Sequence, residues 1–193
     1  MSDGRYFFAL WPDDEVRLQI SAMSRRMTSK GRAHHPSDLH MTLVFLGQIT
    51  DSQLRCINDA ADEIRGRPFM LHLDRIDYWP RPRILWAGPE QTPEPLSQLV
   101  FDLKNSLIPC GFEPERRKYK PHVTLHRKAE TIGPGDIAPS IEWPANEFVL
   151  AVSGGGAEGS PRYRVLQRWP LDTAGDSFTD GAAGPHPTKD NGV

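Results

Sequence analysis

The sequence His-Met-Thr-Leu at residues 40–43 returns as His-Val-Thr-Leu at residues 122–125, 82 positions further along the chain. Side chains of an extended strand alternate between its two faces, so in each copy the histidine and the threonine share one face and the apolar residues share the other. Duplicated halves usually pack about a pseudo-two-fold axis, which would bring both strands to one groove. The repeat therefore predicts two imidazoles and two hydroxyls that face a single ligand.

The residues around the two motifs predict a repeated unit of a helix, a His-x-Thr strand and further strands. Apolar periodicity after an acidic start predicts a helix over 13–28, and Thr50 with Gln53 forms a capping box for a helix that reaches residue 64. Thr92 followed by Pro93 begins a third helix. Apolar runs and alternation predict strands over 6–11, 39–46, 69–77, 84–87, 121–127, 148–152 and 163–169.

The predicted fold class is α+β, with two pseudo-symmetric lobes whose antiparallel sheets line a central groove and whose helices lie on the outside. A chain of 193 residues with 38% apolar and 25% charged residues suits one packed domain, which we expect over residues 1–171. From about Asp172 the composition turns to Gly, Pro, Ala, Asp and Thr, with little to bury. Residues 172–193 are therefore predicted to be a disordered tail.

Basic residues gather around the second motif, although the whole chain carries a formal charge of only −2. That net charge gives no global attraction to nucleic acid, but a local basic cluster suits an anionic ligand. A solvated basic turn is the alternative interpretation, and the position beside the motif favours the ligand. The cluster consists of Arg116, Arg117, Lys118, Lys120, Arg127 and Lys128.

The chain carries no sequence signal for a membrane or for secretion. Its apolar runs are short and charges recur throughout, and residues 6–11 are too few for the apolar core of a signal peptide. Cys56 and Cys110 alone make no disulfide framework and lack the spacing of metal ligands. We therefore expect a cytoplasmic protein without membrane contact, and a monomer.

The paired motifs suit acid–base chemistry on a phosphodiester. The unperturbed pKa of histidine is about 6.5, so one histidine of a pair can take a proton from water while the other gives a proton to the departing oxygen. Threonine hydroxyls and nearby cations can hold the non-bridging phosphate oxygens. This scheme needs no metal and no cofactor. A 2′,3′-cyclic phosphate at an RNA end is a substrate of this kind, because its attacking and leaving oxygens lie on opposite sides of phosphorus.

The motifs and their flanking segments resemble the two-histidine phosphoesterases, and within them the RNA 2′,3′-cyclic phosphodiesterases, also called bacterial 2′-5′ RNA ligases. The resemblance runs from about Arg5 to Leu171. It implies hydrolysis of an RNA 2′,3′-cyclic phosphate to a 2′-phosphomonoester, on RNA ends or small cyclic nucleotides, with weak reverse 2′-5′ ligation as a further expectation. It rests on residues 6–12, 39–47, 80–86, 119–125 and 163–166.

The resemblance also implies roles for individual residues. His40 would be the proton donor to the leaving 3′ oxygen and His122 the proton acceptor that activates water, while spacing alone leaves the opposite assignment open. Thr42 and Thr124 would bind the phosphate. Arg127 matches a basic residue that members of the family often carry shortly after the second motif.

Strand alternation makes predictions for the residues that follow each motif. Arg127 has the opposite parity to His122, so it would reach the phosphate only if the strand bends or ends there. His126 shares the face of His122 and is interpreted as a surface residue at the strand end. Phe45 falls on the face opposite His40, yet its ring makes it a candidate to stack a nucleobase.

The remaining histidines and aromatic residues have structural interpretations. His34 and His35 precede the first motif and are expected at the surface or at the rim of the groove. Tyr78 and Trp79 are weaker candidates for base stacking. The tryptophans are expected mainly in the core, at Trp11, Trp79, Trp86, Trp143 and Trp169.

Two other classes of function compete with the phosphodiesterase. A zinc hydrolase would use His40, His122 and His126, but no carboxylate or cysteine lies in register, and strand residues four apart are separated by about 13 Å. A module that only binds RNA ends or nucleotides is the main alternative. Two histidines in matched positions argue against it, because arginine or lysine would serve binding alone.

Overall fold

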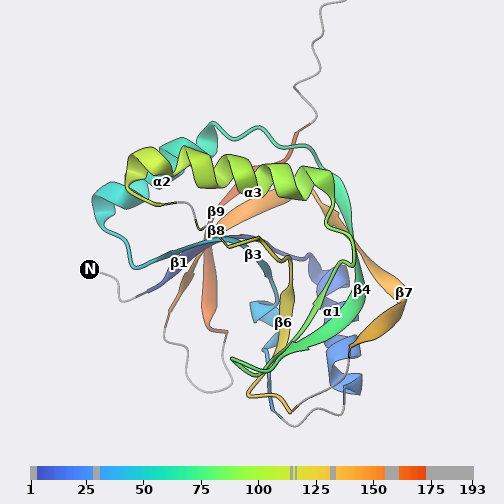
Figure 1. Cartoon of the computed structure of the whole chain (residues 1–193). Helices are drawn as coiled ribbons and strands as arrows, with labels where there is room; N and C mark the ends of the chain where they lie inside the picture. Colours follow the sequence, from blue (N-terminus) through green and yellow to red (C-terminus); the bar gives the residue numbers. More distant parts are fainter. Residues whose placement is uncertain are drawn as a thin grey trace, which may run out of the picture.

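The strands of the described chain hydrogen-bond into one antiparallel sheet (Figure 1). The structure, a computed structural model, describes residues 4–27, 31–113, 115, 117–130, 134–154 and 161–172. The predicted tail beyond residue 172 and Arg116 of the basic cluster lie outside the described residues. The strands are β1 (Tyr6–Leu10), β2 (Arg32–Ala33), β3 (Met41–Gly47), β4 (Phe69–Trp79), β5 (Ile84–Gly88), β6 (Val123–Arg127), β7 (Gly135–Ala145), β8 (Glu147–Ser153) and β9 (Tyr163–Pro170).

The two His-x-Thr strands, β3 and β6, are neighbours at the centre of this sheet. The strand order is β7-β4-β5-β6-β3-β1-β8-β9, and β2 pairs with β6 on its own. β3 and β6 share a single register pair, Met41 with Val123. The predicted α+β class with antiparallel strands and two similar halves is confirmed, and the halves join as one continuous sheet.

The helices begin where local signals predicted them. α1 (Asp14–Arg26) starts after Asp13, whose carboxylate accepts a hydrogen bond from the Val16 amide at 2.8 Å. α2 (Asp51–Asp62) has the predicted capping box of Thr50 and Gln53, in which each side chain binds the other residue's backbone amide. α3 (Glu94–Ser106) begins just after Pro93. These signals are read from neighbouring residues, which is why the sequence alone revealed them.

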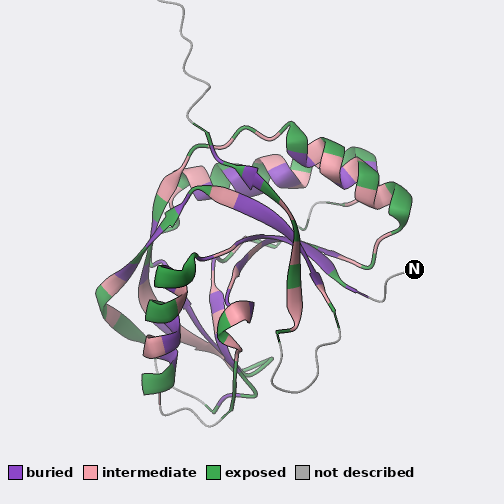
Figure 2. Cartoon of the chain, turned by 180° about the vertical axis from the view of Figure 1, so that it is seen from behind, coloured by how far each residue is buried: buried purple, intermediate pink, exposed green. Residues whose placement is uncertain are grey.

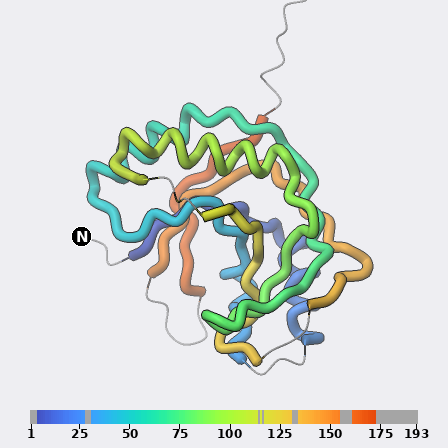
Figure 3. Tube along the Cα trace, in the orientation of Figure 1, coloured from blue at the N-terminus to red at the C-terminus, as the bar shows by residue number. Residues whose placement is uncertain are grey.

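Each helix covers an outer face of the sheet. α1 packs against β7 and against the short helix η1 (Pro36–Asp38), whereas α3 packs against β3 and α2. Figure 3 shows α2 and α3 side by side over one half of the sheet, with α1 beside the other half. Figure 2 shows that the helices turn their exposed residues outward and that the buried residues face the sheet.

The core lies between the helices and the sheet. It includes Ile20 of α1, Ile57 of α2, Leu103 of α3 and Met41 of β3, all with almost no exposed surface. The expectation that tryptophans belong to the core holds for the buried residues Trp86, Trp143 and Trp169. Trp11 and Trp79 are only half-buried, and their rings contact His40 and His122 respectively.

β7 has no counterpart among the sequence predictions. It contains Pro139 and Pro144, and proline cannot donate a ladder hydrogen bond, so its sequence does not indicate a strand. β7 lies at one edge of the sheet, where only one side of the strand needs a partner. An edge position therefore accommodates both prolines.

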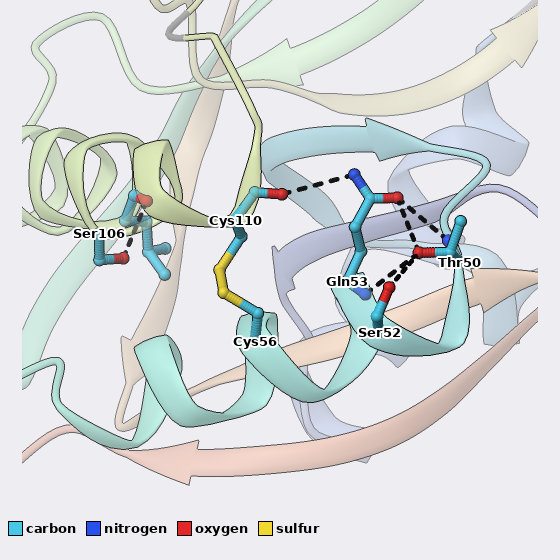
Figure 4. The surroundings of a disulfide bond; sticks show 7 residues. Thr50, Ser52, Gln53, Cys56, Ser106 and Cys110 are labelled. Atoms are coloured by element: carbon cyan, nitrogen blue, oxygen red, sulfur yellow. Dashed lines mark hydrogen bonds between the residues drawn. A yellow bond between two sulfur atoms is a disulfide. The ribbon is translucent and has the colours of Figure 1, made fainter.

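Cys56 of α2 and Cys110 of the short helix η2 (Ile108–Cys110) form a disulfide bond, with Cα atoms 5.6 Å apart (Figure 4). The Gln53 side-chain amide also donates to the Cys110 carbonyl at 3.4 Å. Two cysteines predicted no disulfide framework, and this single bond was not foreseen from the sequence, because α2 and η2 meet only in the folded chain. Disulfides persist mainly in oxidising compartments, so the cysteines no longer support a cytoplasmic location.

No helix in the described part of the chain is long and apolar enough to cross a membrane.

Candidate active site

A cavity of about 390 Å³ opens beside the two central strands. All six candidate site residues from the sequence line it: His40, Thr42, Phe45, His122, Thr124 and Arg127. Both histidines are half-buried, so their rings reach the cavity while remaining packed. The structure therefore brings the two motifs to one shared groove, as the repeat predicted.

The two histidine rings are oriented by the same hydrogen bond. Nδ1 of His40 lies 2.6 Å from the Asp38 carbonyl, and Nδ1 of His122 lies 2.8 Å from the Lys120 carbonyl. A carbonyl only accepts, so Nδ1 carries the hydrogen and donates in both rings. Nε2 is then the nitrogen that each neutral ring offers to a ligand.

Aromatic side chains enclose His40. Its ring stacks on Trp11, with centroids 5.4 Å apart and planes 9° apart, and it also contacts Phe7 at 4.8 Å and Tyr163 at 4.9 Å. Burial lowers the pKa of His40 to about 4; the bond to the Asp38 carbonyl opposes this shift, and the charges of His122 and Arg127 add to it. The free protein therefore holds His40 neutral near pH 7.

Asp38 anchors the loop before His40. Its buried carboxylate accepts backbone hydrogen bonds from Arg162 at 2.8 Å and Tyr163 at 3.2 Å. The same residue's carbonyl accepts from the His40 ring. Asp38 therefore links the first motif to the start of β9, which carries one wall of the aromatic enclosure.

His122 has a more cationic neighbourhood. The Trp79 ring meets it edge-on at 4.5 Å, and Lys120 Nζ lies 4.4 Å from the centre of the Trp86 ring. Burial lowers the pKa of His122, the bond to the Lys120 carbonyl opposes this, and the charges of Lys120, Arg127 and Arg117 lower it further. His122 is thus also neutral in the free protein, in part because of cations.

A second, smaller cavity of about 180 Å³ adjoins the first and shares Thr42 and His122 with it. The Tyr119 hydroxyl donates to the Thr42 carbonyl at 3.0 Å and ties the two motif strands together. Burial raises the pKa of this phenol. Part of the predicted basic cluster faces this cavity, namely Arg117, Lys118 and Lys120.

A β-bulge in β6 changes the direction of the residues after the second motif. The register pairs Trp86 with Thr124 but Leu85 with His126, which leaves Leu125 as the extra residue. A bulge of this kind reverses the alternation of side chains beyond it. Arg127 therefore lines the cavity, although an ideal strand would have pointed it away.

The same bulge turns His126 away from the groove. The ring is buried, and its Nε2 lies 3.1 Å from the Ser24 hydroxyl and 3.3 Å from the Ser24 carbonyl on α1. The predictions that His126 shares a face with His122 and lies at the surface were wrong. The zinc alternative loses its third ligand, because this imidazole lies behind the sheet.

An equivalent bulge occurs in β3. Here Ala9 pairs with Thr42 and Phe8 with Val44, so Leu43 is the extra residue. Phe45 consequently lines the cavity with 62% of its surface exposed, and its assignment to the opposite face was wrong. Both halves thus carry a bulge directly after the His-x-Thr pair.

Both halves of the chain match one family model, described as LigT like phosphoesterase, over residues 10–86 and 87–166. The chain belongs to the LigT-like phosphoesterase family. It is 35% identical over 176 residues to the RNA 2′,3′-cyclic phosphodiesterase of Escherichia coli K12, covering 86% of this chain and 96% of the relative. It is 34% identical over 190 residues to the enzyme of the same name from Methanothermobacter thermautotrophicus, covering 91% of this chain and 95% of the relative.

Solved structures of the family share the fold. The crystal structure of Escherichia coli LigT complexed with 3′-AMP superposes with a TM-score of 0.79 at 32% identity, covering 86% of this chain and 97% of that one. The apo form of the same protein gives a TM-score of 0.78 at 33% identity, covering 89% and 99%. The family resemblance inferred from the two motifs is therefore confirmed.

Two aromatic residues around His40 had no predicted place in the site. Trp11 and Tyr163 enclose His40, and both fall in segments that carry the family resemblance, but their contact with the histidine depends on the folded sheet. Trp79 meets His122, whereas the Tyr78 hydroxyl donates to the Ala129 carbonyl at 3.2 Å. These contacts join elements far apart in the sequence, which local patterns do not reveal.

Proposed function

We propose that this LigT-like phosphoesterase hydrolyses the 2′,3′-cyclic phosphate at RNA ends to a 2′-phosphomonoester, without a metal, by acid–base catalysis between His40 and His122. The observation that carries the proposal is that the two rings line one cavity and are held through Nδ1 by matching backbone carbonyls. This leaves two Nε2 atoms for one phosphate.

The proposed reaction moves one proton to each side of phosphorus. His122 takes a proton from a water molecule, whose oxygen forms a bond to phosphorus. The bond from phosphorus to the 3′ oxygen breaks, and His40 gives its proton to that oxygen, so the phosphate remains on the 2′ oxygen. A 5′ hydroxyl in place of water would give a weak 2′-5′ ligation. Each positioned proton transfer contributes roughly 10²–10⁴ in rate.

The division of roles has support from the surroundings of the rings. Burial lowers the pKa of His122, and the charges of Lys120, Arg127 and Arg117 lower it further, which favours the neutral base. His40 begins neutral, so it must gain a proton when substrate binds. The negative charge of the cyclic phosphate raises the pKa of a nearby imidazole, and the short bond to the Asp38 carbonyl also favours the charged ring.

The other candidate residues have proposed binding roles. Thr42 and Thr124 would donate hydroxyl hydrogen bonds to the non-bridging oxygens, and Arg127 would balance their charge as it builds up. Phe45 offers an exposed ring for a nucleobase. Structures of Escherichia coli LigT complexed with 3′-AMP, ATP and NADP+ support a nucleotide as part of the ligand.

The decisive experiment is incubation with a short oligoribonucleotide that ends in a 2′,3′-cyclic phosphate, followed by identification of the product isomer. We expect a 2′-phosphate, with a rate that excess EDTA leaves unchanged. A protein that only binds RNA ends would release no product. A 3′-phosphate, or loss of turnover under chelation, would contradict the proposed mechanism.

A further inference from the structure

We propose that His34 is a positioning residue, which holds the Arg127 guanidinium in the orientation that binds the substrate phosphate; the inference rests on the proposed function. Arg127 Nε donates a hydrogen bond to His34 Nε2 at 3.0 Å. The family resemblance assigned no role to His34, which the sequence placed at the surface or the rim. The bond connects it directly to a residue that lines the cavity.

The backbone around His34 is fixed to the same strand. β2 pairs with β6 through Arg32 with Arg127 and Ala33 with His126. The next amide, that of His34, donates to the carbonyl of Leu125 at 2.8 Å, the extra residue of the bulge. The bulge turns Arg127 toward the groove, and the short strand β2 brings the imidazole beside it.

The chemistry of the pair allows only one direction for the hydrogen bond. A guanidinium has donors and no acceptor, so His34 Nε2 must carry a lone pair and the ring must be neutral. The charged or titratable groups around the ring are Arg127, His40, Arg162 and Arg32, and none of them stabilises an imidazolium. Burial and these charges lower the pKa of His34 to about 3, so the bond persists at neutral pH.

The bond also decides which edge of Arg127 meets the ligand. Nε is used by His34, and the two terminal nitrogens form the planar fork that matches two oxygens of a phosphate. Arg127 is an exposed, long side chain, and ordering such a chain costs conformational entropy. His34 removes part of that cost before substrate arrives.

Kinetics of matched variants test this role. We expect His34→Leu to lower kcat/KM by about threefold to tenfold, less than the loss of Arg127 itself, because the guanidinium remains but must be ordered when substrate binds. The fall should appear mainly in kcat, because charge builds up on the phosphate oxygens in the transition state. His34→Gln keeps an acceptor of similar reach and should restore most of the loss, and His72→Leu on β4 is the control.

A double-mutant cycle separates positioning from a general structural effect. In an Arg127→Ala background, His34→Leu should have no further effect on kcat/KM, because the group it orients is gone. Additive losses would overturn the proposal, as would failure of His34→Gln to recover activity while its thermal unfolding matches the parent protein.

A measurement on the unmodified protein needs neither a variant nor turnover. We expect a ¹⁵N–¹⁵N coupling across the hydrogen bond between Arg127 Nε and His34 Nε2, and a shift of the terminal Arg127 nitrogens when inorganic phosphate is added. Absence of that coupling would overturn the role of His34. If the coupling is present but a cyclic phosphate oligonucleotide is not hydrolysed, the proposed function fails and the contact stands.

Discussion

The two histidines are held alike but surrounded differently. Each donates from Nδ1 to the carbonyl two residues earlier, at 2.6 Å for His40 and 2.8 Å for His122. His40 then meets three aromatic rings, whereas His122 lies beside the cations Lys120 and Arg117. The comparison shows that the repeated motif sets the orientation of the ring, while the residues around it set its affinity for a proton.

The bulges extend the comparison to the fifth residue after each histidine. Leu43 and Leu125 are the extra residues in the two halves, so the strands turn the equivalent positions, Phe45 and Arg127, into the same cavity. One half therefore contributes an aromatic ring and the other a cation. The same bulge in both strands, followed by different side chains, therefore gives the groove an aromatic end and a cationic end.

The largest effect is expected from breaking the pair itself. His40→Ala or His122→Ala should each lower kcat by about 10²–10⁴-fold, since each removes one of the two proposed proton transfers. The double variant should lose little more, because the two groups act as a unit. Single-turnover assays on a cyclic phosphate oligonucleotide measure this, and near-full turnover by either single variant would refute the assigned roles.

Replacing the cation at one end of the groove should have the next largest effect. Arg127→Ala is expected to lower kcat/KM by about tenfold to a hundredfold, because the phosphate loses a charge-assisted hydrogen bond. Steady-state kinetics should show the loss mainly in kcat. A change confined to KM would mean that Arg127 binds substrate and transition state equally well.

The dependence of kcat/KM on pH tests how the surroundings of the two histidines set their pKa values. Both histidine pKa values are lowered, that of His40 to about 4, so the singly protonated pair in the free enzyme becomes scarcer as pH rises above 6.5. We expect log(kcat/KM) to fall with a slope approaching −1 from about pH 7 upward. Lys120→Met should move the profile to higher pH, because it removes a charge that lowers the pKa of His122.

A matched variant controls the last experiment. Lys118→Met removes a cation from the same segment, and Lys118 is not among the groups that shift the pKa of His122. Its profile should coincide with that of the parent enzyme. Equal shifts in both variants would show that the general charge of the cavity, and not Lys120 itself, sets the proton affinity of His122.

The aromatic end of the groove should contribute less than the cationic end. Phe45→Ala is expected to raise KM by about fivefold, at the low end for base stacking, because the ring is 62% exposed. kcat should stay within about twofold. Comparing cyclic phosphates with different bases provides the measurement, and an unchanged KM for every base would exclude stacking on Phe45.

The smallest effect on activity is expected behind the sheet. His126 Nδ1 is buried and has no hydrogen-bond partner among the described residues, and the equivalent position in the first half is the apolar Val44. His126→Leu removes this unpaired nitrogen but also the bond to the buried Ser24 hydroxyl, so it should lower the free energy of unfolding by about 1–3 kcal/mol and leave kcat within about twofold. Urea denaturation and steady-state assays test this, and a tenfold loss of activity would place His126 in the reaction.

Sequence reasoning succeeded where neighbouring residues carry the signal. The apolar periodicity of α1, the capping box at Thr50 and the alternation within each His-x-Thr pair are local signals, and they identified these helices and the two rings. Alternation failed after Leu43 and Leu125, because a single extra residue reverses it and leaves no mark in the composition.

Other features depended on contacts that only the folded chain creates. The disulfide joins residues 54 positions apart, and the bond between His34 and Arg127 joins β6 to the residue that follows β2. The prolines of β7 concealed a strand that exists because it lies at the edge of the sheet.

Because of the Cys56–Cys110 bond, the measured stability of the protein depends on whether the sample is oxidised or reduced. The bond closes a loop of chain that lies wholly between the two motifs. A closed loop restricts the conformations of the denatured chain. Breaking such a cross-link typically costs about 2–4 kcal/mol of stability. Samples kept in air and samples kept in dithiothreitol therefore differ in covalent structure, and their melting temperatures should not be compared directly.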